Sequence, residues 1–279
     1  MQLTLEHINQ YQSYLYNQER SQATIEKYIR DIYKFMEYLN DHDLSKEHLI
    51  EYKKLLLETY QTSSINSMII SIHGFLDFIG LSDYKVKLLK TQKKLFIEKD
   101  KELTKKEYKR LLETAKSEDN QRLYMLLQTI CATGIRVSEH KYITIESLKR
   151  KKTTINNKGK IREIVYPNSL KKKLIQYCEK NNITKGAIFI TKNGKPLDRS
   201  NIWKDMKKLC RKAHVDEGKV FPHNLRHLFA FTYYHIEKDL VRLADILGHS
   251  SIETTRIYTK TSISSYEKQF EKMYLIDQE

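Results

Sequence analysis

Residues 247–259 read Leu-Gly-His-Ser-Ser-Ile-Glu-Thr-Thr-Arg-Ile-Tyr-Thr, and this stretch decides how the C-terminal part of the chain folds. Gly248 follows an apolar run, and glycine is favoured where a helix ends in a left-handed turn. Ser250, with an acidic residue three positions later, has the spacing of a helix cap. The stretch therefore predicts a helix end, a tight turn that carries His249, and a new helix that presents Tyr258 about two turns beyond its cap.

Upstream, residues 221–227 read Phe-Pro-His-Asn-Leu-Arg-His and have the layout of a helix start that can bind an anion. Proline is favoured in the first turn of a helix. His223 and Arg226 stand three residues apart and share one helix face, where an imidazole and a guanidinium suit a phosphate. His227 makes with His223 a pair spaced like two zinc ligands, but no third ligand is evident and we expect no metal.

A third stretch, Ala-Thr-Gly-Ile-Arg-Val-Ser-Glu at residues 132–139, follows an apolar helical run. Gly134 is expected to end that helix and so to deliver Arg136 at its C-terminal end. We interpret Glu139 as a structural carboxylate that supports the basic cluster, not as an acid or base in a reaction.

The strands expected in this chain lie between the two arginine stretches. Residues 153–156 and 161–166 flank the turn Asn157-Lys158-Gly159-Lys160, which predicts an antiparallel hairpin. Residues 187–191, Ala-Ile-Phe-Ile-Thr, are predicted to form a third strand. The C-terminal part is therefore expected to be mostly helical with a small sheet.

Four apolar stripes at helical spacing predict a small all-α bundle in the first 80 residues. The stripes are Leu5, Ile8, Tyr11 and Leu15; Ile25, Tyr28, Ile29, Ile32, Phe35, Met36 and Leu39; Leu49, Tyr52, Leu55 and Leu56; and Ile65, Met68, Ile69, Ile72, Phe75, Leu76 and Ile79. Ser21 is expected to be the N-cap of the second helix, the third is expected to follow Ser45, and Gly80 suits a helix C-terminus.

The stripes end before a lysine-rich stretch with little helical periodicity. We interpret residues 85–102 as a linker between a helical domain at 1–84 and a second domain at 103–279. Thr104-Lys-Lys-Glu107 has the capping-box pattern that opens a helix. The fold class expected is mainly α with a small β-sheet: an N-terminal all-α bundle followed by an α+β domain.

Composition excludes several classes of protein. The 279 residues are 40% hydrophobic with a mean hydropathy of −0.63, which suits a globular chain. No apolar run approaches the roughly 18 residues of a membrane helix, and the start lacks a signal-peptide layout. Three cysteines far apart form neither a disulfide framework nor a zinc site, so we expect reduced thiols in a cytoplasmic protein.

The charge is strongly asymmetric along the chain. The whole sequence carries 50 Lys and Arg against 35 Asp and Glu, a net charge of +15. Residues 1–84 hold 7 basic and 12 acidic side chains, whereas 85–279 hold 43 and 23. A merely lysine-rich surface would explain the total but not this asymmetry, which indicates a polyanion partner such as nucleic acid for the second part.

Taken together, these stretches resemble the tyrosine recombinases of the lambda-integrase superfamily. The family signature is an Arg, a Lys in a β-hairpin, His-x-x-Arg, a His or Trp, and a Tyr. The matching residues here are Arg136, Lys158, His223, Arg226, His249 and Tyr258. The order and the steps between the last three are similar to those of Xer-type members, and the resemblance spans about residues 5 to 262.

The resemblance implies a site-specific DNA recombinase that cuts and rejoins strands through a 3′-phosphotyrosine at Tyr258, with no cofactor. It implies that His223 helps with the tyrosine proton, that Lys158 protonates the leaving 5′-oxygen, and that His249 donates to the phosphate. Two guanidiniums can grip the non-bridging oxygens, while a tyrosine of pKa about 10 needs a base or a cationic field. Lys160 shares the hairpin and stays an alternative to Lys158.

The expected partner is double-stranded DNA with a specific core site, bound between the two domains. Lysines and arginines that contact phosphate give affinity rather than sequence preference. The candidates are Lys87, Lys90, Lys93, Lys94, Lys160 and Arg162. The acidic bundle would need to segregate its basic residues; Lys27, Arg30 and Lys34 fall on one side of a helix, which suits DNA or an ordinary solvated face equally.

An apolar stripe within residues 263–279 follows the candidate nucleophile: Tyr266, Phe270, Met273 and Tyr274. The resemblance implies a helix that docks on a neighbouring protomer in a tetramer on paired sites, whereas packing on its own domain is the alternative. Accessory proteins are possible partners, and no membrane is expected.

We expect no arm-type DNA-binding domain before the bundle, which fits an Xer-type or mobile-element enzyme. A type IB topoisomerase would share the chemistry without site preference. A DNA-binding regulator that never cuts is the rival from another class, and the intact signature weighs against it.

Overall fold

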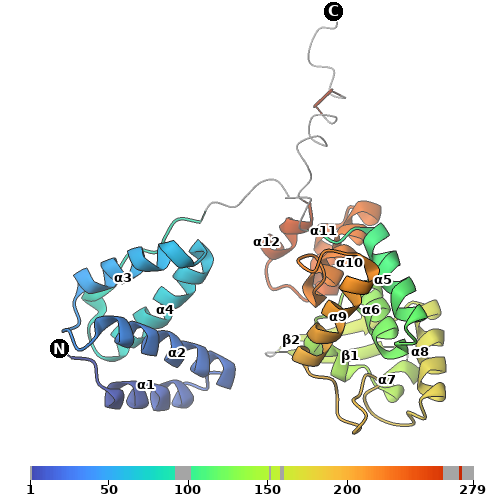
Figure 1. The fold of residues 1–279 in the computed structure, drawn as a ribbon, viewed down its shortest axis with the longest axis horizontal. Helices are drawn as coiled ribbons and strands as arrows, with labels where there is room; N and C mark the ends of the chain where they lie inside the picture. The colour runs from blue at the N-terminus through green and yellow to red at the C-terminus, as the bar shows by residue number, and fades with distance from the viewer. Residues whose placement is uncertain (1, 92–101, 151, 158–159, 260–269, 272–279) are drawn as a thin grey trace, which may run out of the picture. The chain divides into compact units, whose positions relative to one another are not determined.

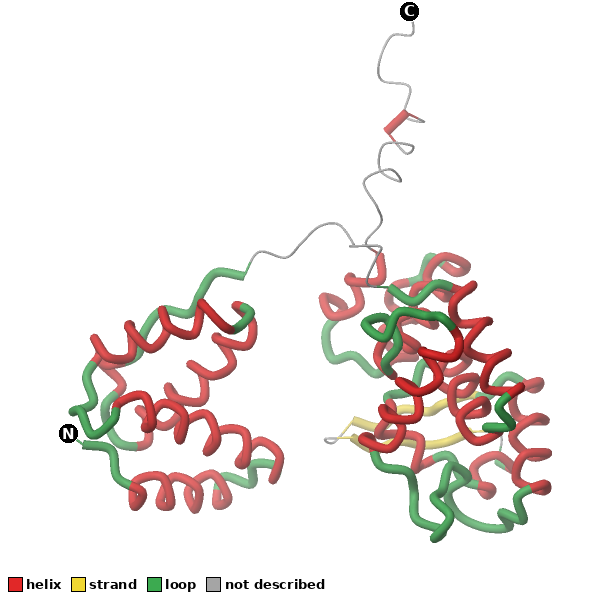
Figure 2. The backbone as a smooth tube through the Cα atoms, viewed as in Figure 1, coloured by secondary structure: helices red, strands yellow, loops and turns green. Residues whose placement is uncertain are grey.

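The computed structural model describes residues 2–91, 102–150, 152–157, 160–259 and 270–271 (Figures 1 and 2). The chain divides into two compact units, Met1–Lys94 and Leu95–Glu279. The described residues are mainly helical with one two-stranded sheet, which confirms the fold class predicted from the sequence. No helix of this described part is long and apolar enough to cross a membrane.

The first unit is the predicted helical bundle. Its helices are α1 (Leu5–Asn17), α2 (Gln22–Leu39), α3 (Lys46–Thr59) and α4 (Thr62–Phe78). Ser21 caps α2 as predicted, and Ser45, after which a helix was expected, is the N-cap of α3. Each side chain accepts a backbone N–H three residues later. The expectation that Leu55 faces inward is wrong, since this residue is 48% exposed. Leu49, Tyr52 and Leu56 form the buried seam of α3, and Leu55 lies off it.

Part of the predicted basic face of α2 serves the bundle itself. The Lys27 ammonium lies 2.9 Å from the buried carboxylate of Asp31 and donates to Ser71 at 2.7 Å. A buried carboxylate needs such a partner, so Lys27 neutralises the core. The described start of the lysine-rich stretch also packs on this unit. Asn66 bonds both the N–H and the carbonyl of Leu89, each at 2.9 Å.

The second unit is built around α6, which packs against α5, α8 and α10. Its elements are α5 (Lys105–Ser117), α6 (Gln121–Thr133), η3 (Val137–Tyr142), α7 (Ile145–Lys149), β1 (Lys152–Asn157), β2 (Lys160–Val165), α8 (Asn168–Lys180), α9 (Arg199–Ala213), α10 (Pro222–Glu237), α11 (Leu240–Leu247), α12 (Ile252–Thr255) and η4 (Arg256–Thr259). Apolar side chains of α6 are buried on more than one face, as a central helix requires.

The hairpin has the predicted strands in antiparallel register, from Lys152 opposite Val165 to Asn157 opposite Lys160. β2 lies beside α11, and β1 lies beside η3 and α7. The predicted third strand at 187–191 is wrong: this segment makes only isolated bridges. Ile188 and Phe189 are adjacent and both fully buried, so the segment lacks the alternation of a half-buried strand.

Helix ends carry the signals that position the site. Thr104 and Glu107 form the predicted capping box of α5. Gly134 ends α6 and Gly248 ends α11, both with a left-handed backbone. The prediction that Ser250 caps the following helix is wrong by one residue. Ser251 is the N-cap of α12, and its hydroxyl accepts the N–H of Glu253 at 3.2 Å.

Candidate active site

Arg136 is delivered by the end of α6 and is held by Glu139. The Glu139 carboxylate accepts the Arg136 backbone N–H at 2.7 Å and its Nη1 at 3.1 Å. Arg136 Nη2 also donates to the carbonyl of Gly248 at 3.3 Å. Glu139 is buried and Arg136 is partly exposed, so one face of this guanidinium is fixed and another stays open to a ligand. The interpretation of Glu139 as a supporting carboxylate agrees with this geometry.

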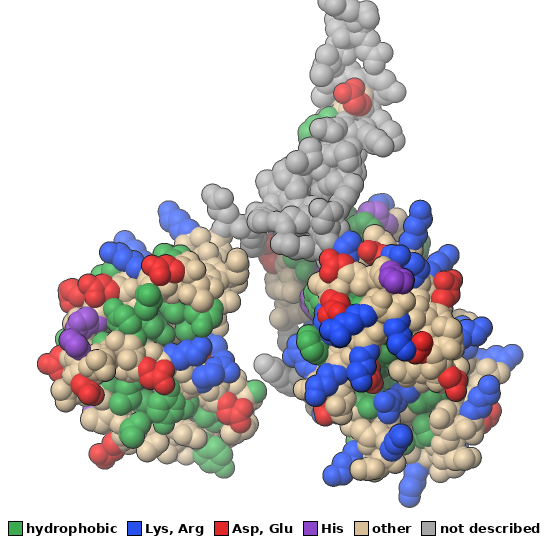
Figure 3. All heavy atoms as spheres, viewed as in Figure 1, with side chains coloured by type: hydrophobic (Ala, Val, Ile, Leu, Met, Phe, Trp, Pro, Cys, Tyr) green, Lys and Arg blue, Asp and Glu red, His purple; other side chains and the backbone are tan. Residues whose placement is uncertain are grey.

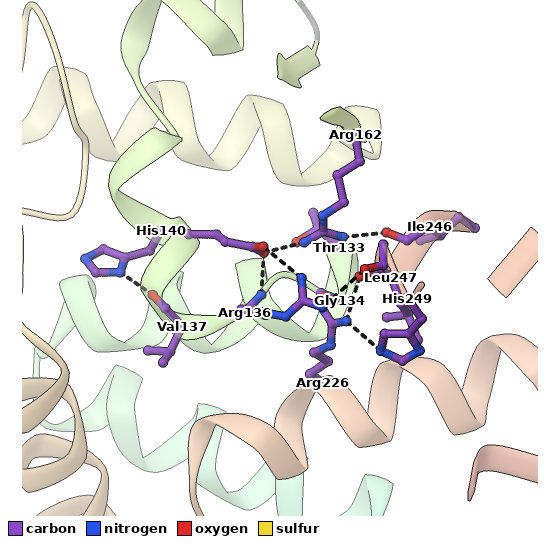
Figure 4. Close-up of polar contacts among 12 residues, drawn as sticks. Thr133, Gly134, Arg136, Val137, His140, Arg162, Arg226, Ile246, Leu247 and His249 are labelled. Atoms are coloured by element: carbon purple, nitrogen blue, oxygen red, sulfur yellow. Dashed lines mark hydrogen bonds and ion pairs between the residues drawn. The ribbon is translucent and has the colours of Figure 1, made fainter. Parts of the chain in front are cut away.

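Arg226 joins the ends of two helices. Its Nη1 donates to the carbonyl of Gly134 and its Nη2 to that of Leu247, each at 2.7 Å (Figure 4). The residue is only 2% exposed. Burial and the neighbouring Arg136 and Arg162 lower its pKa to about 10, so the guanidinium stays charged at neutral pH.

His249 lies in the turn after α11 and points at Arg226 in Figure 4. Its Nε2 is 3.0 Å from Arg226 Nη2, and its Nδ1 is 2.9 Å from the hydroxyl of Thr255. Because a guanidinium only donates, Nε2 accepts and the imidazole proton sits on Nδ1, facing Thr255. Burial, then Arg226 and Arg136, lower the pKa of His249 to about 4, so the ring is neutral at pH 7.

Tyr258 lies in η4 and is 1% exposed. It belongs to one buried cluster with Ala230 of α10 and Leu243 and Leu247 of α11. It also stacks on His249, with ring centroids 6.3 Å apart. Burial raises the pKa of the hydroxyl, while the charge of Arg226 and a hydrogen bond with it act in the opposite direction. The hydroxyl is therefore protonated at neutral pH and sits beside a cation.

His223 lies one helical turn before Arg226 on α10 and is exposed. Partial loss of water around the ring, then repulsion from Arg226 and Arg136, lower its pKa. A neutral imidazole at the open edge of a cationic cluster can accept a proton. Lys158, the remaining residue of the predicted set, lies outside the described residues. The site thus gathers Arg136, Arg226, His249 and Tyr258, with His223 nearby on α10.

Arg162 has a different place from the one predicted. We expected it to contact DNA, yet its side chain is only 10% exposed. Its Nη1 donates to the carbonyl of Ile246 at 2.6 Å, and its Nη2 pairs with Glu139. Burial lowers the pKa of this guanidinium and the charge of Glu139 opposes that shift. Both ends of the fork are engaged inside the protein, so Arg162 ties β2 to the site instead of presenting a free charge.

The other predicted DNA contacts are only partly described. Lys87 and Lys90 are exposed on the first unit, whereas Lys93 and Lys94 lie outside the described residues. Lys160 pairs with Asn157 at the described edge of the hairpin. None of these observations tests contact with DNA.

Sequence reasoning missed Thr255, which is fully buried and bonds His249. Its signal was present, since it stands within the quoted stretch six residues after the histidine, but a buried hydroxyl partner is recognised only once both side chains are placed. It also missed His227 as a neighbour of Tyr258, with ring centroids 4.8 Å apart.

The charges of the site favour an anion. Three guanidiniums converge there, and Glu139 is the one carboxylate that the described residues pair with them. Among the described residues, no group of three or more His, Cys, Asp or Glu side chains could hold a metal ion. The guanidiniums offer forked donors, the tyrosine hydroxyl lies beside a cation, and the imidazoles are neutral. This combination suits transfer of a phosphoryl group to the tyrosine oxygen.

Two family models match the chain in the order of its two units. The N-terminal SAM-like domain of phage integrases matches residues 8–81, and the phage integrase family matches residues 101–264. The second match contains the five described catalytic candidates and Lys158.

Known relatives match along nearly the whole length. Tyrosine recombinase XerA of Pyrococcus furiosus is 29% identical and covers 99% of this chain and 96% of its own. Tyrosine recombinase XerD of Staphylococcus epidermidis is 30% identical and covers 91% of this chain and 93% of its own.

Solved structures share the fold at lower identity. The XerH site-specific recombinase bound to its difH substrate gives a TM-score of 0.72 at 20% identity, covering 96% of this chain and 84% of that one. A lambda integrase dimer bound to a core site gives 0.74 at 17% identity, covering 91% and 94%. With one family model over more than half of its residues and a XerD recombinase 30% identical along most of its length, the chain belongs to the phage integrase family of tyrosine recombinases.

Proposed function

We propose that this chain is a site-specific DNA recombinase whose nucleophile is Tyr258. The observation that carries the proposal is the place of Arg226, which contacts the tyrosine hydroxyl and, at 3.0 Å, His249. Arg136 stands beside it, anchored by Glu139 and partly open. A phosphate held by the two guanidiniums would lie next to the hydroxyl that attacks it.

The chemical step follows from these roles. The oxygen of Tyr258 attacks phosphorus, and the bond from phosphorus to the 5′-oxygen breaks. Arg136 and Arg226 neutralise the charge that develops on the non-bridging oxygens. The electron pair of the broken bond leaves with the 5′-oxygen, which takes a proton from Lys158. Attack by a 5′-hydroxyl on the phosphotyrosine reverses the step, so the strand is rejoined without an external energy source.

The tyrosine proton needs an acceptor, because burial raises the pKa of Tyr258. His223 suits this role. Its lowered pKa keeps it neutral, and it lies exposed on the same helix as Arg226. Once a phosphate favours its protonated form, His249 would donate to that phosphate through Nε2, while Thr255 holds the ring at Nδ1.

The DNA would be double-stranded with a specific core site. Support comes from the basic second unit, on whose visible face lysines and arginines are widespread in Figure 3, and from the DNA-bound state of the similar XerH and lambda integrase structures. Phosphate contacts are assigned to the exposed Lys87 and Lys90 and to Lys93, Lys94 and Lys160. Such contacts position the enzyme, and base readout sets the site.

Assembly and location complete the proposal. A lambda integrase tetramer bound to a Holliday junction is a structural neighbour at 16% identity, with a TM-score of 0.74, and residues 263–279 carry an apolar stripe. We assign those residues to docking on a neighbouring protomer in a tetramer, and we place the protein in the cytoplasm, where its DNA lies. The 85–102 stretch would then be the connector between a DNA-binding bundle and the catalytic domain.

The test uses nicked duplexes from candidate host or element DNA, incubated with the protein in EDTA and then denatured in detergent. A nick lets the short cleaved fragment diffuse away and traps the adduct. We expect a protein–DNA adduct that Tyr258→Phe abolishes while DNA binding persists. Tyr233→Phe on α10 is the matched control and should cleave normally. An adduct in Tyr258→Phe would move the nucleophile elsewhere, and relaxation of supercoiled DNA without site preference would favour a topoisomerase.

A further inference from the structure

Tyr258 rests on a second histidine that the reaction above does not use. The ring of His227 meets the ring of Tyr258 edge to face, with centroids 4.8 Å apart and planes at 62°. His227 follows Arg226 on α10, so one helix supplies both the cation that contacts the hydroxyl and the ring against which the tyrosine lies. Edge-to-face pairs of this kind stabilise one orientation of an aromatic ring.

His227 is itself held from the far side. Its Nδ1 lies 3.5 Å from Oε1 of Glu102, at the very start of the described second unit, three residues before α5. Both side chains are mostly buried. Burial, with a smaller effect of His223, lowers the pKa of His227 to about 4, so the ring beside this carboxylate is neutral at pH 7.

The remaining walls around Tyr258 are apolar. The buried residues that share its cluster, Ala230, Leu243 and Leu247, are aliphatic and offer no directional contact. Arg226 lies beside the hydroxyl end, and His249 stacks at a longer distance, 6.3 Å. Of the two histidine rings beside Tyr258 in the described residues, that of His227 is thus the nearer. Simple burial would be served as well by an apolar residue, whereas a histidine at this place also faces the carboxylate of Glu102, 3.5 Å from its Nδ1.

We propose that His227, anchored by Glu102, is a positioning residue that holds the ring of Tyr258 so that its hydroxyl stays at Arg226. The inference rests on the proposed function for its catalytic consequence, but the placement of the ring can be measured without DNA. A shift of the attacking oxygen by about 1 Å can slow a reaction by as much as 100-fold.

The first measurement needs no substrate. N-acetylimidazole acetylates accessible tyrosine hydroxyls, and peptide mass spectrometry reports the extent at each site. In the unaltered protein Tyr258 should be protected, while Tyr16, which is 74% exposed, reacts and serves as internal standard. His227→Ala and Glu102→Ala should each increase acetylation of Tyr258 several-fold relative to Tyr16. His235→Ala, which removes an exposed histidine of the same helix, is the control and should leave Tyr258 protected.

The second measurement is the rate of adduct formation in a single turnover on the nicked duplex. We expect His227→Ala to slow it about tenfold or more, with Kd unchanged and the protein still folded at the assay temperature. The double variant with Glu102→Ala should be no slower than His227→Ala alone, because both act through one contact. His227→Phe keeps an aromatic ring edge but removes the nitrogen that faces Glu102. Its rate of adduct formation should lie between that of the unaltered protein and that of His227→Ala.

The outcomes separate the two proposals. Suppose that Tyr258 loses its protection in His227→Ala and Glu102→Ala, but that even the unaltered protein forms no adduct. The placement of the ring then stands, and the catalytic assignment of Tyr258 is overturned. An adduct formed at the same rate in all variants, with Tyr258 still protected, would overturn the positioning role alone. A slower rate matched by an equal loss of DNA binding, or by an equal loss of folded protein at the assay temperature, would show that His227 only stabilises the fold, and this too overturns the proposal.

Discussion

Arg162 of the hairpin closes directly over Gly248 at the end of α11. A Cβ atom on Gly248 would lie 2.5 Å from Cδ of Arg162, nearer than side chains approach, and the backbone of Gly248 is left-handed with φ +63°. The same arginine bonds the carbonyl of Ile246. The hairpin that carries Lys158 is thereby joined to the turn that carries His249, although the two lie far apart in sequence.

Gly248→Ala should therefore slow cleavage. The left-handed backbone alone costs a non-glycine residue about 1–2 kcal/mol, and the methyl group would also displace Arg162. Gly194→Ala is the matched control, because Gly194 has φ +74° but nothing within 4 Å of an added Cβ. We expect denaturant unfolding to show a lower free energy of unfolding in both variants. The rate of adduct formation should fall at least tenfold only in Gly248→Ala. Equal cleavage by the two variants would mean that the Arg162 contact has no part in the reaction.

Glu139→Gln should be the most destabilising of the polar substitutions at the site. The buried carboxylate pairs with Arg136 and Arg162, and breaking a buried pair costs about 3–5 kcal/mol because a charge is left uncompensated. Glu163→Gln, which breaks an exposed pair with Lys152, should cost under about 1 kcal/mol. Urea unfolding of both variants decides the matter, and similar losses would contradict the assignment of Glu139 as the support of the cluster.

The elements of the fold could be predicted where one local signal decides them. Ser21 and Thr104 cap helices as expected because a cap needs only its own side chain and the next turn. The prediction of a strand at 187–191 was wrong because adjacent buried residues fit a strand or a buried loop equally well. Packing in the surrounding core decides between a strand and a buried loop, and a local sequence pattern holds no information on that packing.

The candidate site divides in the same way. Arg136, Arg226, His249 and Tyr258 were named because they match the signature of the family that the sequence resembles, and they converge in space. The role of Arg162 could not follow from spacing, because an arginine on a strand near a lysine-rich turn has the same pattern whether it faces DNA or Glu139. Its partners, Glu139 and the Ile246 carbonyl, stand 23 and 84 residues away in sequence.

Thr255→Val tests the partner of His249 that the sequence did not reveal. Valine keeps the shape but removes the acceptor of the Nδ1 proton, so the ring loses its fixed orientation and a buried donor is left unpaired. We expect adduct formation to slow about tenfold or more, with DNA binding retained. Thr254→Val, at the exposed neighbouring position, is the control. Normal cleavage by Thr255→Val would show that Arg226 alone orients the imidazole.

Stability should fall as the pH is lowered below about 6.5, the ordinary pKa of histidine. His227 and His249 have folded-state pKa values of about 4, because burial disfavours their charged forms. Between these values the unfolded chain binds more protons than the folded one, so acid favours unfolding. Each such histidine lowers the free energy of unfolding by up to about 1.4 kcal/mol per pH unit. Urea unfolding at pH 7, 6 and 5 measures the slope, and a flat profile would contradict buried neutral rings.

DNA binding near pH 6 should take up protons. In the free protein, the low pKa of His249 results from burial and from repulsion by Arg226 and Arg136. A phosphate between these groups offsets that repulsion and favours the imidazolium, so the pKa rises on binding. Calorimetry in two buffers of different ionisation enthalpy measures the uptake directly. His249→Asn should reduce it and His235→Asn should not. Proton release, or the same uptake in His249→Asn, would place the bound phosphate away from this imidazole and therefore away from Tyr258.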